Sequence, residues 1–389
     1  MYKYRHIIST FILTFVLTCV LCFTFGGHFI NFINAFNGNL NSKISVAQKI
    51  VDDNYISTYD EQKLTDSTLN GYIKGLGDKY AQYISPSQME EFLSITTGNY
   101  KGIGVTVITD AAGLITVTDV SENSPAKKGG ILPGDIIIKA EDTLVNASNY
   151  DEALNIIKGV DDDDDNVKIT IMRQNEEIEI NLVRETIEST YVKEKVIDNI
   201  YYISLSSFEG KSSEQFDRAI SNAENSGCKG IIIDLRNNPG GTLDNVLSIS
   251  DRILDEGTIL TIKSKSKEDV YKAKDNKKCD LPICILVNNH SASAAEVLTA
   301  ALKDNKRATV VGTTTYGKGV VQSLFTLDSN SLIKITTAKY YTPGGICIDG
   351  IGVTPDIQVE LDEKYNSALV STIEKENDKQ LMEAIKVLS

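Results

Sequence analysis

The segment from Val287 to Glu296 contains the first residue in this sequence that could act as a nucleophile, Ser293. A buried-strand pattern ends at Val287, and apolar residues at helical spacing follow from Val297 to Leu302. A serine at a helix N-terminus lies beside unpaired N–H groups and the positive end of the helix dipole, which can stabilise a developing oxyanion. Serine is also a preferred N-cap residue, so this position alone predicts a cap rather than a nucleophile.

A nucleophilic serine needs a base, and histidine is the usual one. None of the three histidines is well placed, because His6 and His28 flank an apolar N-terminal run and His290 is only three residues from Ser293. A lysine can serve when burial or a cationic neighbour lowers its pKa from the ordinary value of about 10.4. The candidate is Lys318, which lies between two glycines and leads into an apolar run.

The segment Gly312 to Lys318 nearly matches the phosphate-binding pattern G-x-x-x-x-G-K. Gly319 replaces the Ser or Thr that would hold magnesium, and β-branched residues rather than helix formers follow. This excludes a nucleotide site. Gln322, four residues after Lys318, could orient the amine by hydrogen bonding.

The segment Asp234 to Gly241 leaves a strand pattern and ends in the pair Gly240 and Gly241. Such a turn can aim a backbone N–H at a reacting carbonyl, and it can equally be a tight strand exit without a chemical role. The sequence leaves both interpretations open.

Together these segments resemble the C-terminal processing (tail-specific) peptidases, a serine peptidase family with a PDZ domain. The similarity runs in family order over roughly residues 45–360 and includes residues 234–241, the Ser293 segment, 316–322 and 338–345. The lead-in Leu76 to Ile84 is similar to the family's helical LDPYSxYL segment. The resemblance implies that Ser293 is the nucleophile, Lys318 the general base and Gln322 its partner. It also implies an oxyanion hole drawn from Gly240, Gly241 and the Ala294 amide.

A β-rich stretch between the lead-in and these motifs resembles a PDZ domain. Short strand patterns at 105–108, 114–117, 135–138 and 167–171 surround one helix, which a capping pattern starts at Asn149 and which continues to Ile157. The resemblance makes Gly102, Ile103, Gly104 and Val105 the loop and strand that hold a peptide's terminal carboxylate.

Residues Ile7 to Phe25 are nearly all apolar, carry no charge and follow Lys3 and Arg5. A run of this length is close to the roughly 20 residues that span a bilayer core, and no good cleavage site follows it. We therefore expect an uncleaved single-pass anchor in a bacterial cytoplasmic membrane. The preceding basic residues place everything after His28 outside the cytoplasm.

The expected fold class is α/β multidomain. It comprises a transmembrane anchor with a cytoplasmic tip (1–28), a helical N-terminal region (29–98), a PDZ domain (99–186), a ClpP/crotonase-like α/β peptidase core (187–360) and a helical tail (361–389). Strand runs at 230–235, 283–287 and 309–311 alternate with helical patterns, one of them capped at Ser212 and Gln215. The tail is expected to pack on the body or on another subunit, so a homo-oligomer is left open.

The amino-acid composition indicates which classes of ligand and partner the chain is expected to bind. The formal net charge of −14 disfavours nucleic-acid binding. The acidic run Asp161 to Asp165 is interpreted as a solvated loop, and we expect no metal and no cofactor. Free thiols are expected, with a disulfide between Cys279 and Cys284 as the alternative.

The predicted function is a membrane-tethered serine endopeptidase with a Ser-Lys dyad that acts on proteins recognised through their C-terminal tails. The alternative is a catalytically silent PDZ scaffold, which the joint presence of Ser293, Lys318 and Gln322 disfavours. An acyl-CoA enzyme on a crotonase-like core is a third class, and its chemistry does not require this dyad.

Overall fold

The computed structural model describes residues 39–109, 113–160, 164–274, 279–365 and 370–389. The predicted anchor, Ile7 to Phe25, lies outside these ranges. No helix within them has the length and apolar character needed to cross a membrane. The chain divides into two compact units, one ending at Leu69 and the other beginning at Asn70.

The first unit contains α2 (Leu40–Asn54) and the start of α3 (Glu61–Lys74). Asn39 caps α2, because its side chain accepts a hydrogen bond from the N–H of Asn41 at 3.2 Å. The helical spacing seen in the sequence is thus realised as two helices.

The lead-in segment Leu76 to Ile84 is not helical, and its predicted helical character is wrong. Gly77 has a φ of +67° just after α3, where a left-handed conformation ends a helix. The Asp78 carboxylate then accepts the N–H groups of Tyr80 at 2.9 Å and Thr336 at 3.2 Å. These contacts place β1 (Gln82–Ile84) antiparallel to β18 (Leu332–Tyr341), so tertiary pairing decides the conformation here. Helix α4 (Pro86–Thr97) follows.

The β-rich module contains the expected strands. Its main sheet has the order β3-β4-β5-β7-β8, with β6 paired to β5, and β2 pairs separately with β9. The bounds are β2 Asn99–Gly102, β3 Val105–Thr109, β4 Ile115–Val120, β5 Ile136–Ala140, β6 Thr143–Leu144, β7 Asn166–Arg173, β8 Glu176–Val183, β9 Glu185–Glu188, α5 Pro125–Lys128 and α6 Tyr150–Lys158. The predicted cap of α6 differs in detail: the Asn149 side chain binds the Asn146 N–H and the Leu144 carbonyl and does not cap the helix.

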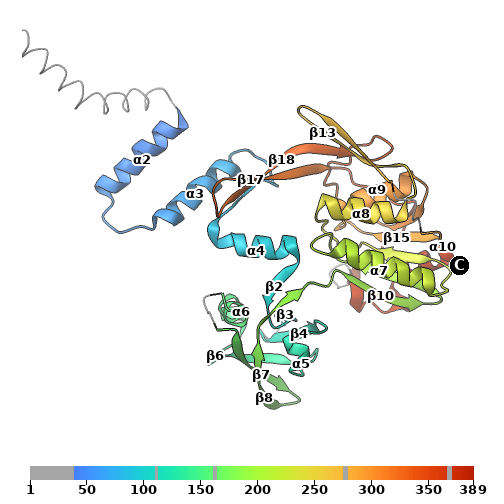
Figure 1. Cartoon of the computed structure of the whole chain (residues 1–389), viewed down its shortest axis with the longest axis horizontal. Helices are drawn as coiled ribbons and strands as arrows, with labels where there is room; N and C mark the ends of the chain where they lie inside the picture. Colours follow the sequence, from blue (N-terminus) through green and yellow to red (C-terminus); the bar gives the residue numbers. More distant parts are fainter. Residues whose placement is uncertain (1–38, 110–112, 161–163, 275–278, 366–369) are drawn as a thin grey trace, which may run out of the picture. The chain divides into compact units, whose positions relative to one another are not determined.

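A six-stranded sheet with the order β10-β11-β12-β15-β16-β19 forms the second module (Figure 1). All neighbouring strands run parallel except β10, which is antiparallel to β11. The bounds are β10 Val192–Ile197, β11 Ile200–Leu205, β12 Ile231–Asp234, β15 Ile283–Val287, β16 Ala308–Gly312, β19 Ile357–Gln358, α7 Ser212–Asn225, α8 Leu243–Ile253, α9 Ala294–Asp304 and α10 Lys379–Leu388.

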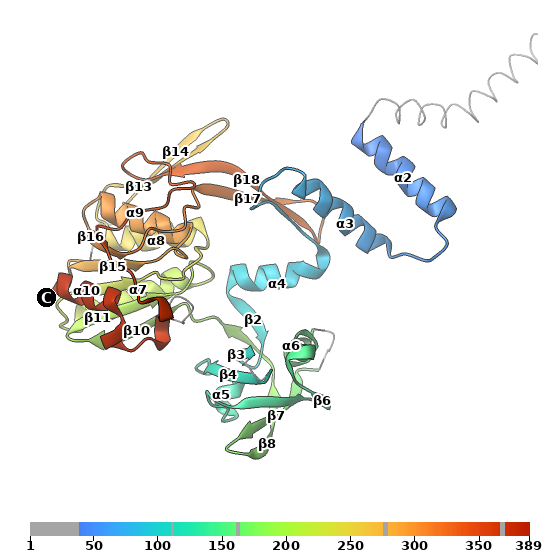
Figure 2. The same cartoon turned by 180° about the vertical axis from the view of Figure 1, so that it is seen from behind.

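Alternating side chains of this sheet enter two different cores. Ile231 and Ile233 pack with α7, α8 and α9, while Ile232 between them packs with Leu381 and Ile385 of α10. This period of two is what a strand buried on both faces requires. Figure 2 shows α10 on the face opposite α7, α8 and α9, so the C-terminal helix packs on the body of this chain.

One predicted helix start is corrected. Ser212 is the first residue of α7 and not its cap, and Lys211 occupies the cap position. The Gln215 side chain instead accepts the N–H of Tyr191 at 2.8 Å, which links the helix to the start of β10.

A second sheet has the order β1-β18-β13-β14, with β17 paired to β18. Its remaining strands are β13 Thr258–Ser264, β14 Glu268–Lys272 and β17 Val320–Thr326, and short 3-10 turns at 363–365, 370–372 and 375–377 precede α10. The four described cysteines, Cys228, Cys279, Cys284 and Cys347, are free thiols. Burial raises the pKa of Cys284 to about 12.

A buried ion pair joins α10 to the end of β12. Arg236 donates to Asp234 at 2.6 Å and to Asp378 at 2.9 Å, and all three side chains are almost fully buried. Asp378 also accepts the N–H of Leu381 and so caps α10. Both carboxylates raise the pKa of the Arg236 guanidinium, which keeps it charged.

We expect Asp378→Asn to lower the free energy of unfolding by about 3 kcal/mol, because it leaves a buried charge with one partner fewer. Asparagine retains the capping oxygen, so the helix cap is preserved and the charge alone is tested. Urea denaturation measures the change, with Asp198→Asn at the exposed Lys375 pair as the control that should change little. Equal effects of the two substitutions would contradict this role.

Candidate active site

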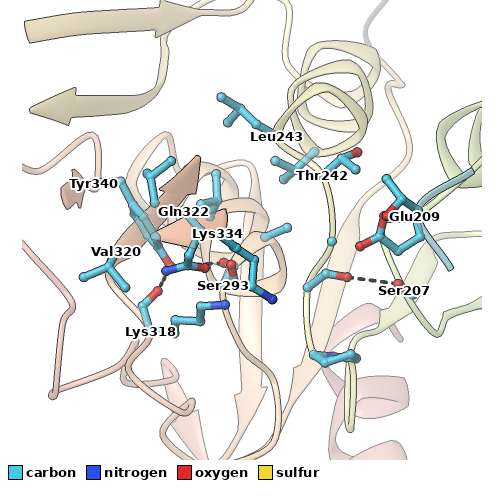
Figure 3. Close-up of a pocket in the computed structure, with 18 of the residues that line it drawn as sticks. Ser207, Glu209, Thr242, Leu243, Ser293, Lys318, Val320, Gln322, Lys334 and Tyr340 are labelled. Carbon is cyan, nitrogen blue, oxygen red and sulfur yellow. Dashed lines mark hydrogen bonds between the residues drawn. The ribbon is translucent and has the colours of Figure 1, made fainter. Parts of the chain in front are cut away.

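The predicted catalytic residues line one cavity at the carboxyl ends of the parallel strands. Its volume is about 420 Å³, and Ser293, Lys318 and Gln322 all contribute to its walls (Figure 3). The loops after β12, β15 and β16 carry the glycine turn, the serine and the lysine respectively. This edge is where open α/β sheets bind ligands.

Ser293 lies at the junction between β15 and α9 in a conformation that serine rarely adopts. Its φ is +56° and its ψ is −115°, whereas an ordinary N-cap residue is extended. Strain of this kind persists where the surrounding structure holds a functional group in place. Ser291 is different, because it is buried and its hydroxyl donates to the Leu235 carbonyl at 2.8 Å. Geometry therefore distinguishes the two serines.

Lys318 is half-buried beside this serine. Burial lowers the pKa of its amine, the charge of Lys334 lowers it further, and Glu296 acts in the opposite direction. The amine lies 4.9 Å from the centre of the Tyr80 ring. Among the described residues no carboxylate forms an ion pair with Lys318, so its neutral form is accessible.

Glu296 joins the serine loop to the lysine loop. Its carboxylate is fully buried and accepts four hydrogen bonds. The donors are Ser293 N at 2.8 Å, Lys318 N at 2.8 Å, Gly317 N at 2.7 Å and Thr315 Oγ1 at 2.6 Å. A single side chain on α9 therefore fixes the backbone of both predicted catalytic residues.

Tyr340 on β18 makes a second link. Its hydroxyl donates to the carbonyls of Ser293, at 3.1 Å, and of Lys318. Burial raises the pKa of this phenol well above its ordinary value, so it remains a donor.

Gln322 lies in the same cavity, but its amide is engaged elsewhere. Its Nε2 donates to Thr336 Oγ1 at 3.4 Å, and the predicted contact with the Lys318 amine is not made in this structure. His290 is exposed and does not line the cavity.

The glycine turn packs directly against Ser293. The Gly240 N–H already donates to Asn238 Oδ1 at 2.8 Å, so it is not available to an oxyanion. Within the described ranges, the N–H groups of Gly241 and Ala294 donate to no protein acceptor. Of the three predicted oxyanion donors, the geometry thus favours Gly241 and Ala294, and Gly240 serves the close approach of the two loops.

Comparison with known proteins connects both modules to described families. Residues 101–183 match the PDZ domain, and residues 199–359 match Peptidase family S41. The "Carboxy-terminal-processing protease" of Bartonella bacilliformis is 35% identical over 332 residues, which are 83% of this chain and 76% of that protein. The "Probable CtpA-like serine protease" of Staphylococcus aureus strain COL is 33% identical over 389 residues, which are 98% of this chain and 77% of that protein. The chain belongs to peptidase family S41.

The sequence-based recognition of a C-terminal processing peptidase is therefore confirmed, and this S41 member is a serine-type peptidase with a PDZ domain ahead of a mixed α/β core. A solved structure of a "Putative S41 protease" from Bacteroides fragilis has a TM-score of 0.56 at 14% identity. The matched region covers 86% of this chain and 92% of that chain, so the two proteins share a similar fold.

Two residues of this S41 site, Glu296 and Tyr340, were not singled out from the sequence. Glu296 had a visible signal, because Ser-x-x-Glu at a helix start is a capping-box pattern. Tyr340 lies in the recognised segment 338–345, but nothing in that segment indicated its role, because only the return of β18 to the cavity places its hydroxyl between the two loops.

The PDZ module presents the predicted carboxylate loop at a sheet edge. Gly104 has a φ of +83°, and a side chain there would meet Ser124 at 2.3 Å, so glycine is required. In the part of the chain described, the N–H groups of Ile103 and Gly104 donate to no protein acceptor. Strand β3, which begins at Val105, is the edge of its sheet and can accept an added peptide strand.

We expect Gly240→Ala to lower kcat/KM by about 100-fold or more, because loss of alignment at an oxyanion site has effects of this size. A Cβ at Gly240 would lie 2.7 Å from Ser293 Cβ and 2.9 Å from Ala294 N, at a φ of +105°. Gly227→Ala is the control, because its φ is +73° but nothing lies within 4 Å of the added carbon. Comparable losses of peptidase activity in both variants would show that backbone strain alone is responsible.

Proposed function

We propose that this S41 peptidase is an endopeptidase in which Ser293 is the nucleophile and Lys318 the general base. The observation that carries the proposal is that one buried carboxylate, Glu296, holds the backbones of both residues at one cavity. The lowered pKa of the Lys318 amine, caused first by burial, supports its role as a base.

In the proposed mechanism, Ser293 Oγ attacks the peptide carbonyl carbon while its proton passes to the Lys318 amine. The carbonyl oxygen becomes an oxyanion that accepts the N–H groups of Gly241 and Ala294. Collapse of this intermediate breaks the C–N bond, and the Lys318 ammonium protonates the leaving amine. Water then attacks the ester and gives one proton to Lys318. The second collapse breaks the C–Oγ bond, the Lys318 ammonium returns that proton to Ser293 Oγ, and the new carboxyl group leaves as a carboxylate after losing its own proton to solvent. Gln322 would act on the amine only after leaving Thr336.

We propose that substrates are proteins bound by their C-terminal tails in the PDZ module. The free N–H groups of Ile103 and Gly104 suit a terminal carboxylate, and the edge strand β3 suits an extended tail. For the core we propose the ClpP/crotonase-like class expected from the sequence, which the mostly parallel six-stranded sheet with helices on both faces supports.

We also propose that the enzyme is tethered to the outer face of a bacterial cytoplasmic membrane. The support is the apolar run Ile7 to Phe25 with Lys3 and Arg5 before it. Fractionation of cells that express the full chain, followed by protease treatment of intact spheroplasts, tests this. Recovery of the chain in the soluble fraction, or protection of the PDZ module from added protease, would contradict the tether.

The catalytic proposal is tested with the full chain in mild detergent, a fluorophosphonate probe and an unstructured protein that has an apolar C-terminus. We expect the probe to modify Ser293, as located by mass spectrometry, and to leave Ser293→Ala unmodified. The same substrate with two aspartates at its C-terminus is the matched control, and it should be cleaved more slowly. Tail binding without labelling or cleavage would instead support the scaffold function.

A further inference from the structure

A second lysine, Lys334, lines the proposed catalytic cavity. It lies on β18, opposite Gln82 of β1 and Leu324 of β17, so neither strand neighbour carries a charge. Its side chain is half-buried, and in the described residues it forms no ion pair. Figure 3 shows it reaching the same part of the cavity as Ser293 and Lys318. Partial burial of a cation without an ion-pair partner costs free energy, and such groups are common at functional sites.

Among the described residues that line the cavity, Glu209 is the only carboxylate. Glu209 follows β11, beside the glycine turn, and its Oε2 is buried without a hydrogen-bond partner in the described part of the chain. Burial raises the pKa of this carboxyl to about 7, and the charge of Lys334 opposes that rise. The charge of Lys334 therefore acts on Glu209 across the cavity, although the two side chains form no direct ion pair in the described residues.

The other titratable groups that face Lys318 are already committed. Glu296 on α9 uses its carboxylate in four hydrogen bonds, and its charge raises rather than lowers the pKa of Lys318. Tyr80 presents its ring to the amine, with Lys79 on that same ring, and the Tyr340 hydroxyl binds two carbonyls. Lys79 shares the Tyr80 ring with Lys318 but does not line the cavity, whereas Lys334 lines it, and the charge of Lys334 lowers the pKa of the Lys318 amine.

We propose that Lys334 is a positioning residue of the reaction, whose positive charge in the cavity favours the neutral, proton-accepting form of Lys318, while Glu209 moderates that charge. The proposal rests on the proposed Ser293–Lys318 dyad. A cationic neighbour is one of the known ways in which an active-site lysine is kept neutral near pH 7. It complements burial, which acts on the same equilibrium.

The direction of the expected pH dependence follows from these charges. The rate of acylation rises with pH as Lys318 loses its proton. Removing the positive charge of Lys334 makes the Lys318 ammonium more stable, so the rising limb moves to higher pH. Removing the negative charge of Glu209 leaves Lys334 unopposed, so the limb moves to lower pH.

The test measures the rate of fluorophosphonate labelling of Ser293 against pH in the full chain, which requires neither the PDZ module nor a protein substrate. We expect Lys334→Gln to label about fivefold more slowly at pH 7, because a smaller fraction of Lys318 is then in the neutral, proton-accepting form. Its rate should approach that of the wild type at high pH. Lys334→Arg keeps the positive charge and should show the wild-type dependence of labelling rate on pH. Glu209→Gln should be labelled faster than wild type at pH 7.

Several outcomes would overturn the role of Lys334. An equal loss of rate at all pH values in Lys334→Gln would indicate a structural role, and a raised KM for peptides with an unchanged labelling profile would indicate substrate binding. If Lys334→Gln fails to fold, an unshifted or upward-shifted limb in Glu209→Gln overturns the proposal by itself. Failure of the dyad is distinguishable, because wild-type labelling would then show no lysine-dependent limb and would survive Lys318→Met.

Discussion

Lys318→Met is expected to lower kcat/KM for peptide cleavage by at least about 10⁴-fold while the protein stays folded. Nucleophile and base act as a unit, so loss of either removes nearly all of their joint contribution. Methionine preserves most of the volume of the lysine stem, and no carboxylate in the described residues is left unpaired by the change. Loss of a half-buried cation should therefore cost little stability.

The measurement is single-turnover cleavage of a fluorogenic peptide, with thermal unfolding of the same preparation. Lys272→Met is the matched control, because Lys272 is an exposed lysine on β14 away from the cavity. Retention of more than about one hundredth of wild-type kcat/KM by Lys318→Met would exceed what a missing general base allows and would reassign the base.

The elements of both modules were largely predictable because their signals are local. The strand runs at 283–287 and 309–311 match β15 and β16, and the helical pattern that begins at Ser212 matches α7. A strand buried on both faces and a helix with one apolar stripe each have a characteristic pattern of apolar residues that can be recognised in the sequence. The helical prediction for Leu76 to Ile84 was wrong, because the conformation of this segment depends on a hydrogen bond from Thr336, which is distant in the sequence, to the Asp78 carboxylate.

The site was predictable to the level of its motif but not of its hydrogen bonds. The sequence predicted Ser293 and Lys318 as a pair, and both side chains line one cavity in the structure. It could not show that Asn238 occupies the Gly240 amide, since this depends on the path of the turn. Gln322 is a similar case, because its partner Thr336 comes from the neighbouring strand.

Glu296 affects the reaction in two ways, through its negative charge and through its hydrogen bonds. The two effects can be separated because they change the rate in opposite directions. Its negative charge raises the pKa of Lys318 and so disfavours the neutral amine. Electrostatics alone therefore predicts that Glu296→Gln should speed the reaction, by up to about tenfold for one pH unit of displacement. Its hydrogen bonds, in contrast, hold the Ser293 and Lys318 backbones in place.

We expect the geometric effect to dominate, so that Glu296→Gln lowers kcat by about 10³-fold. The glutamine carbonyl can replace one carboxylate oxygen, but its NH₂ group then faces two donors that lose their acceptor. These are either the Ser293 and Lys318 N–H groups or the Gly317 N–H and the Thr315 hydroxyl, and each pair fixes the lysine loop. Each buried unsatisfied donor costs about 1–3 kcal/mol, and the loops can relieve this only by moving the catalytic groups apart. Loss of alignment at this scale outweighs the electrostatic gain.

Pre-steady-state kinetics and thermal unfolding of Glu296→Gln measure the two consequences, a lower kcat and a lower Tm. Thr315→Val is the graded comparison, because it removes one of the four donors and leaves both catalytic N–H groups bonded, so its loss of kcat should be much smaller. If Glu296→Gln is as active as wild type or faster, the charge of Glu296 matters more than its hydrogen bonds. The alignment of Ser293 with Lys318 must then come from Tyr340, whose hydroxyl spans the same two loops.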